Sequence, residues 1–406
     1  MRMVYVGIAA FLVAMGATWI VTPGVIRLAG LLGAVDLPGG RKTHRGPMPR
    51  IGGLAVFFGF VAGMLFAAAA TGNLFTFPQT GVYWRGLAYA ATGLLLVGLL
   101  DDLYRLSYLW KFAAQLAAAV YVWNCGFRIE TISHPLGGGF DLQWLALPIT
   151  LLWIVGITNA VNLIDGLDGL AVGIALITTS AVAVIAFARG ELGVTAASVT
   201  LAGSLIGFLR FNFNPARIFL GDSGSLFLGF VLAVTSVRGS QKGPTAVAIL
   251  VPLLVLGLPL LDTGLAIVRR LYRLGEDGAR RENTVGYVLT NLNRVFLPDR
   301  RHIHHRLIDL GLSHRAAVLV LYIVGLVFAL AAFAMTLLKS LLVAVLLGLV
   351  LLVTMASFFA LLYLRVWRVE DGGGEDGPLP RPPAPKREPL APTIGHSHGR
   401  GWPDRS

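Results

Sequence analysis

Long apolar stretches separated by short polar ones dominate the pattern of this sequence. Their usual length, about 20 residues, is what an α-helix needs to cross a hydrocarbon core of about 30 Å. We predict about eleven transmembrane helices, over residues 4–24, 51–71, 82–100, 108–125, 143–160, 170–188, 194–210, 219–237, 245–268, 316–336 and 340–364. The predicted fold class is therefore an all-α polytopic membrane protein.

The composition agrees with this pattern. Hydrophobic residues make up 56% of the 406 residues and charged residues only 13%, against about 25% charged in ordinary soluble domains. These values exclude a water-soluble globular protein. The single cysteine, Cys125, has no partner within the chain for an internal disulfide.

The distribution of basic residues predicts the orientation in the membrane. If the N-terminus lies outside and the helices alternate, most Lys and Arg residues fall on the inside, as in membrane proteins generally. The net charge of +12 is then explained by the Lys and Arg residues of the inside loops, and we expect no nucleic-acid partner. The C-terminus is cytoplasmic in this scheme. The predicted transmembrane domain spans 1–368, with cytoplasmic loops at 25–50, 101–107, 160–169, 211–218 and 269–315, and the Gly/Pro-rich tail 369–406 is expected to be disordered.

Acidic motifs interrupt the apolar pattern at three places. Asp101-Asp102 ends one apolar segment, NAVNLIDGLDG (159–169) ends another, and Asp222 in FLGDSGSLFLG begins a third. Carboxylates at membrane depth are costly and usually serve a function. Charge bias alone set the orientation, yet all three motifs fall on the inside. The sequence therefore predicts one site at the inside face.

Each carboxylate motif has a functional and a structural interpretation. Asp101 and Asp102 suit a Mg²⁺ ion or a general base, or they are a water-exposed pair that opposes the dipole at a helix C-terminus. Asp222 is either an N-cap or part of a phosphate-binding helix N-terminus. In the central motif, Asn162 offers a carbonyl oxygen to a metal, and Asp165 and Asp168 can accept hydrogen bonds from a nucleobase or ribose. A polar turn between helices is the alternative.

Basic side chains near these motifs suit phosphate. Lys111 either snorkels to the inside surface or contacts a pyrophosphate. The string RRHIHHR (300–306) lacks the spacing of known zinc motifs, so phosphate or sugar recognition fits it better than zinc, with a solvated charge run as the alternative. We expect Asp262 to pair with Arg269 or Arg270.

Together these motifs resemble the polyprenyl-phosphate N-acetylhexosamine-1-phosphate transferase family. Four strings over residues 20–365 carry the resemblance: RKTHRGPMPRIGG, the Asp101-Asp102 pair, NAVNLIDGLDGLA and GDSGSLFLG. The string HIHHRL is similar to the branch that uses UDP-N-acetylglucosamine and undecaprenyl phosphate. Members of this family are multi-helix inner-membrane enzymes with a cytoplasmic site.

The resemblance implies a reaction and its partners. A Mg²⁺-dependent enzyme (Mn²⁺ is the alternative metal) would transfer N-acetylglucosamine-1-phosphate from UDP-N-acetylglucosamine to a polyprenyl phosphate lipid and release UMP. A homodimer is left open. The alternative within the family is a phospho-MurNAc-pentapeptide transferase. A transporter of anionic solutes is the alternative of another class, but transporters place their sites near the bilayer midplane.

The resemblance also implies roles for individual residues. Asp222 and Asn162 would hold the metal, Asp101 and Asp102 would orient or deprotonate the lipid phosphate, and Lys111 would contact the diphosphate. Substrate-binding residues would be Asn159, Asp165 and Asp168 on the nucleotide side, His302, His304, His305 and Arg306 at the sugar phosphate, and Lys42 and His44 at the entrance for the lipid phosphate.

The topology is testable by labelling. We expect Thr43 and Ser313 on the cytoplasmic side and Gly190 on the opposite side, because the basic residues concentrate on the cytoplasmic side. Single cysteines at these positions, in a Cys125→Ser background, would be labelled with an impermeant maleimide in right-side-out and inverted vesicles. Labelling of position 190 from the cytoplasmic side would contradict a one-sided site.

Overall fold

The computed structural model describes residues 2–36, 46–72, 78–133, 139–240 and 307–337, with isolated positions at 256–257, 259–264, 267, 346, 348–351 and 353. Helices dominate these ranges, which confirms the predicted helical class. Their bounds are α1 Arg2–Leu32, α2 Gly53–Thr71, α3 Pro78–Tyr104, α4 Tyr108–Asn124, α5 Ala146–Ile164, α6 Leu170–Ala188, α7 Leu192–Asn212, α8 Gly221–Ser240 and α13 His314–Leu337.

Seven described helical segments are long and apolar enough to cross a membrane. They lie in α1, α2, α3, α5, α6, α7 and α13. The 17 residues of α4 and the apolar stretch Gly221–Val237 of α8 are shorter. The predicted spans 245–268 and 340–364, like the tail 369–406, lie mostly or wholly outside the described residues. The count of eleven and the orientation therefore stay predictions.

Several helices continue past their predicted ends. The helix α1 extends to Leu32, α3 to Tyr104 and α5 to Ile164, so the loops predicted from residues 25, 101 and 160 begin later. Asp101 and Asp102 thus belong to the last turns of α3, and Asn162 belongs to α5. This regular backbone fixes the direction of their side chains more firmly than a loop would.

Two short strand pairs, which the hydrophobic pattern did not indicate, lie between helices. Strand β1 (Val35–Asp36) pairs antiparallel with β2 (Met48–Pro49), with Val35 opposite Pro49. Strand β3 (Thr131–Ser133) pairs with β4 (Gly139–Asp141), before a 3₁₀ turn at Gln143–Leu145. Strands of two or three residues are too short to produce a recognisable alternation.

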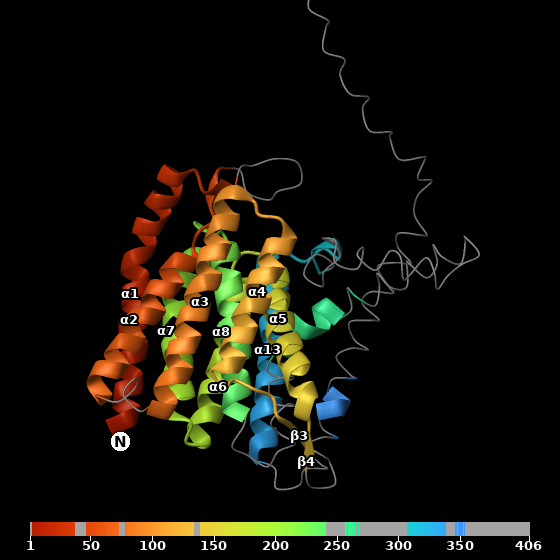
Figure 1. The fold of residues 1–406 in the computed structure, drawn as a ribbon. Coiled ribbons are helices and arrows are strands. Elements are labelled where there is room, and N and C mark those ends of the chain that lie inside the picture. The colour runs from red at the N-terminus through yellow and green to blue at the C-terminus, as the bar shows by residue number, and fades with distance from the viewer. Residues whose placement is uncertain are drawn as a thin grey trace, which may run out of the picture. The chain divides into compact units, whose positions relative to one another are not determined.

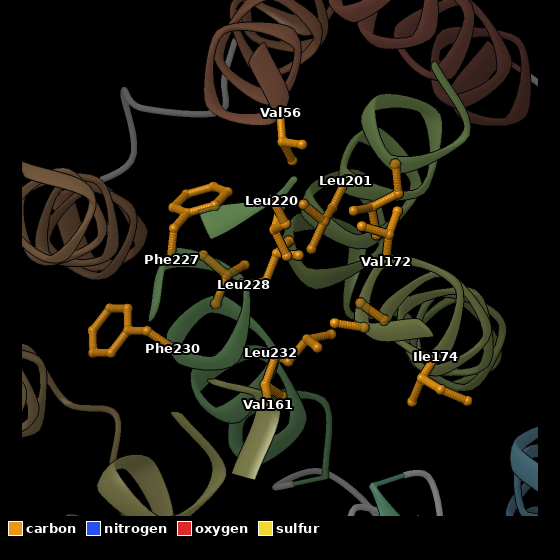
Figure 2. Close-up of a cluster of buried hydrophobic side chains, with 14 of the residues drawn as sticks. Val56, Val161, Val172, Ile174, Leu201, Leu220, Phe227, Leu228, Phe230 and Leu232 are labelled. Carbon is orange, nitrogen blue, oxygen red and sulfur yellow. The ribbon is translucent and has the colours of Figure 1, made fainter. Parts of the chain in front are cut away.

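The helix α8 lies at the centre of the described bundle. It packs against α2, α3, α5, α6 and α7, and Phe227, Leu228 and Phe230 are fully buried. Figure 2 shows these side chains among Val56 of α2, Val161 of α5, Val172 and Ile174 of α6, and Leu201 of α7. A helix that is apolar on all sides is expected to be enclosed by others.

Glycines let the backbones approach α8 closely near its N-terminus. A Cβ atom on Gly98 of α3 would lie 2.4 Å from the carbonyl oxygen of Asp222, and one on Gly53 of α2 would lie 2.2 Å from the amide nitrogen of Gly224. Small residues at such crossings are typical of membrane helix pairs. In Figure 1 the helices run side by side, so the C-terminal end of α3 and the N-terminal end of α8 meet at one end of the bundle.

Candidate active site

The carboxylate of Asp102 joins the end of α3 to the start of α8. Its Oδ1 accepts the backbone N–H of Asp222 and its Oδ2 accepts that of Ser223, both at 3.0 Å. The first N–H groups of a helix have no partner within the helix, and here a carboxylate from another helix supplies one. Asp102 is only 5% exposed. The capping role predicted for Asp222 is thus filled by Asp102.

Lys111 connects two other carboxylates at the same place. Its Nζ lies 3.1 Å from Oδ2 of Asp101 and 2.8 Å from Oδ2 of Asp222. The three side chains are partly exposed, at 24% for Lys111, 13% for Asp101 and 27% for Asp222. Lys111 therefore does not simply snorkel to water, and the ion pairs remain accessible from outside the bundle.

Asn162 adds an amide from α5 to this cluster. Its Nδ2 donates to Oδ1 of Asp222 at 3.1 Å and to Oγ of Ser225 at 2.7 Å. Asp222 is thus contacted by Lys111 on one oxygen and by Asn162 on the other. Helices α3, α4, α5 and α8 each contribute to this cluster, which we call the Asp222 cluster: Asp101, Lys111, Asn162 and Asp222.

Asp101 and Asp222 are the carboxylates of the Asp222 cluster that could hold a magnesium ion. Among the described residues, no group of three or more His, Cys, Asp or Glu side chains is arranged to hold a metal. Mg²⁺ commonly takes only one or two protein carboxylates and completes its shell with water and substrate phosphates. Asp222 and Asp101 could supply such carboxylates, and Asn162 could add its side-chain oxygen only if its amide, whose Nδ2 donates to Asp222, turned over.

The two aspartates of the α5–α6 turn have different surroundings. The pKa of Asp165 is raised well above its usual value by burial, and then by the carboxylates of Asp222 and Asp102. The negative charges of Asp222 and Asp102 thus act on Asp165. Oδ2 of Asp168 instead accepts Nδ2 of Asn214 and the backbone N–H of Ala216, each at 3.0 Å, which ties the turn to the α7–α8 connection.

Asn159 lies one turn deeper in α5 than Asn162. It forms a reciprocal amide pair with Gln115 of α4, in which Nε2 of Gln115 donates to Oδ1 of Asn159 at 3.3 Å. A substrate contact by Asn159 would require this pair to open.

The structure brings together five of the predicted site residues: Asp101, Asp102, Lys111, Asn162 and Asp222. Six others lie outside the described residues: Lys42, His44, His302, His304, His305 and Arg306.

Sequence reasoning missed three residues that support the site. Gln115 follows Lys111 by four residues, so the helical period could have indicated that both lie on one face of α4. Arg50 donates to the last carbonyls of α3, whereas the sequence shows it only as a basic residue of the string RKTHRGPMPRIGG. Tyr322 of α13 donates to the carbonyl oxygen of Gly169 at 2.6 Å, and no signal in the sequence predicts that contact.

Fold and site define a helical membrane protein whose carboxylate and lysine side chains gather at one end of its helices. The glycosyl transferase family 4 model matches residues 84–240. A probable undecaprenyl-phosphate N-acetylglucosaminyl 1-phosphate transferase of Bacillus subtilis (strain 168) is 42% identical over 326 residues, covering 80% of this chain and 84% of that protein. The chain therefore belongs to the polyprenyl-phosphate N-acetylhexosamine-1-phosphate transferase family, as its motifs predicted.

The names of two further relatives specify different sugar donors. Decaprenyl-phosphate N-acetylglucosaminephosphotransferase of Mycobacterium tuberculosis (strain ATCC 25618 / H37Rv) is 38% identical over 338 residues, covering 76% of this chain and 78% of that protein. Phospho-N-acetylmuramoyl-pentapeptide-transferase of Shouchella clausii (strain KSM-K16) is 31% identical over 305 residues, covering 71% and 84%. The chain is thus more similar to the two N-acetylglucosamine relatives than to this muramoyl-pentapeptide relative.

Proposed function

We propose that this protein transfers N-acetylglucosamine-1-phosphate from UDP-N-acetylglucosamine to undecaprenyl or another polyprenyl phosphate and releases UMP. The reaction would be the first membrane step of a cell-envelope glycan pathway, at the cytoplasmic face of the plasma membrane. The Asp222 cluster at one end of the bundle carries the proposal, because it combines carboxylates for a hard cation with a lysine for phosphate. The 42% identity to the Bacillus subtilis relative supports the donor.

The chemistry must bring two anionic phosphates together. When bound, Mg²⁺ would offset their charge and stabilise the leaving UMP. Asp222 and Asn162 are the residues that would hold it. Lys111 pairs with Asp101 and Asp222, and we infer that its ammonium also contacts the donor diphosphate. A lysine acts well as such a point charge.

Asp101 and Asp102 have different roles in this proposal. Both oxygens of Asp102 accept backbone N–H groups of α8, so we assign it a positioning role. Asp101 is held by Lys111, a partner that a phosphate can take over, and it would orient the lipid phosphate or remove its residual proton. Asp102 thus has a structural role and Asp101 a chemical one.

We propose that the lipid reaches the Asp222 cluster along exposed apolar side chains of α3 and α4. Leu100 and Tyr104 of α3 are 45% and 72% exposed, and Trp110 of α4 is 70% exposed. These apolar side chains are sequence neighbours of Asp101 and Lys111. The prenyl chain could remain in hydrocarbon along this surface while its phosphate enters the site. Asp165 and Asp168 would face the uridine, and the basic and histidine residues predicted in the two cytoplasmic loops would complete the phosphate contacts.

A donor panel tests the proposed function. Purified protein with Mg²⁺ and polyprenyl phosphate is expected to release UMP fastest from UDP-N-acetylglucosamine among UDP-sugars. Omission of the lipid should abolish UMP release. A transporter would release no UMP with or without the lipid. Faster turnover with UDP-MurNAc-pentapeptide would reassign the protein to the muramoyl branch.

Removing the carboxylate of Asp222 should abolish turnover. In the Asp222→Asn variant a hard-cation ligand is lost, so we expect a fall in kcat on the order of a hundredfold or more with the fold retained. Asp262→Asn is the control, because it is the same substitution at a buried aspartate (4% exposed) outside the Asp222 cluster, and it should have a milder effect. Near-normal turnover of Asp222→Asn at ordinary Mg²⁺ concentration would remove Asp222 from the site.

The order of the reaction can be tested by isotope exchange. A phosphate monoester has a second pKa of about 6, so near neutral pH the lipid phosphate is already a dianionic nucleophile and a carboxylate relay would add little. We therefore expect direct in-line displacement. Labelled UMP should exchange into the UDP-sugar only when polyprenyl phosphate or the lipid product is present. Exchange in lipid-free enzyme that is lost on Asp101→Asn would instead indicate a covalent intermediate.

A further inference from the structure

The guanidinium of Arg50 binds the C-terminal end of α3 at the two aspartates. Its Nε donates to the carbonyl oxygen of Asp102 at 3.0 Å, and its Nη2 donates to the same oxygen at 2.6 Å and to that of Asp101 at 3.4 Å. The last carbonyls of a helix have no partner within the helix and carry partial negative charge. Arg50 therefore holds the turn of α3 from which both carboxylates project.

The backbone around Arg50 is fixed against the start of α8. The N–H of Arg50 donates to the carbonyl of Ala34 at 3.1 Å, and the carbonyl of Pro49 accepts the N–H of Phe219 at 2.8 Å. Gly221, the first residue of α8, has φ +75, and a Cβ there would lie 1.8 Å from the carbonyl oxygen of Arg50. The segment that carries Arg50 thus packs directly on the residue before Asp222.

These contacts form a closed loop of three elements: the end of α3, the start of α8 and the segment that carries Arg50. The side chain of Arg50 holds the end of α3, and the Asp102 carboxylate from that turn caps α8. The backbone of Arg50 then packs against Gly221 at the start of α8. Asp101 and Asp222 share Lys111, and they project from the two helix ends that this loop of contacts joins. Their separation therefore depends on Arg50.

We infer that Arg50 is a positioning residue, which sets the separation of Asp101 and Asp222 for the phosphoryl-transfer step without contacting substrate. The inference rests on the proposed function. Arg50 differs from a phosphate ligand, because its guanidinium donates to helix carbonyls. It also differs from a purely stabilising residue, because the turn that it holds carries a reacting group.

The test compares Arg50→Gln, Arg50→Lys and Arg27→Gln, the last being a control at an exposed arginine of α1. Thermal unfolding, kcat and the KM for each substrate would be measured. For Arg50→Gln we expect kcat to fall about ten- to a hundredfold, as small misplacements of catalytic groups do, with both KM values changed little. Arg50→Lys should recover only part of kcat, since one ammonium cannot replace the paired Nε and Nη2 contacts. Arg27→Gln should match the wild type.

A second readout does not need activity. Hydrogen exchange of the peptide covering 219–226 should be faster in Arg50→Gln than in wild type, because the Asp102 cap of α8 loosens, while peptides from α6 stay unchanged. Unchanged exchange at 219–226 would overturn the inference about Arg50, whatever the activity of the wild type. Inactivity of the wild type with every UDP-sugar would separately refute the proposed function. A raised KM for polyprenyl phosphate with normal kcat, restored by lysine, would make Arg50 a phosphate ligand. Faster exchange with normal kcat and KM would make it a stabilising residue only.

Discussion

The carboxylate of Asp102 at the N-terminus of α8 is the interaction on which the site depends. A helix start buried among other helices must find partners for its N–H groups, and α8 finds one on α3. That requirement brings the end of α3 to the start of α8, and glycines at 53 and 98 allow the backbones to approach. Asp101 and Asp222 then come within reach of a single lysine. The geometry of the site therefore follows from a backbone hydrogen-bonding requirement.

The bundle itself explains why so polar a cluster is tolerated. The helix α8 is enclosed by apolar side chains over most of its length, as Phe227 and Phe230 show, and its charged end lies where the enclosure ends. Each carboxylate there has a partner: backbone N–H groups for Asp102, and Lys111 for Asp101 and Asp222. Buried charges are costly unless they are paired, so removal of one member should be felt by the others.

Much of this arrangement could be predicted from the sequence, because long apolar runs and carboxylates at their ends are local signals. The runs predict the described helices, and charge bias with alternation predicts that Asp101, Asn162 and Asp222 lie on one face. The pairing of Lys111 with two aspartates, and the cap by Asp102, depend on helix packing that a single sequence does not encode locally. The same holds for Gln115, which looks like one polar residue in an apolar helix until Asn159 is seen opposite it. Adjacent residues such as Asp101 and Asp102 are identical in chemistry, and only their surroundings separate their roles.

The hydrogen bond from Tyr322 to Gly169 has a consequence for the order of synthesis. It joins α13 to the turn between α5 and α6 across 153 residues of chain, and a Cβ on Gly173 would collide with the same tyrosine ring. Chains emerge from the ribosome N-terminus first, so the motif 159–169 is synthesised long before Tyr322. The nascent protein must carry an acidic turn that lacks this contact until α13 has inserted. Completion of this part of the site is thereby linked to the arrival of a late helix, which a chain ending before residue 322 would never receive.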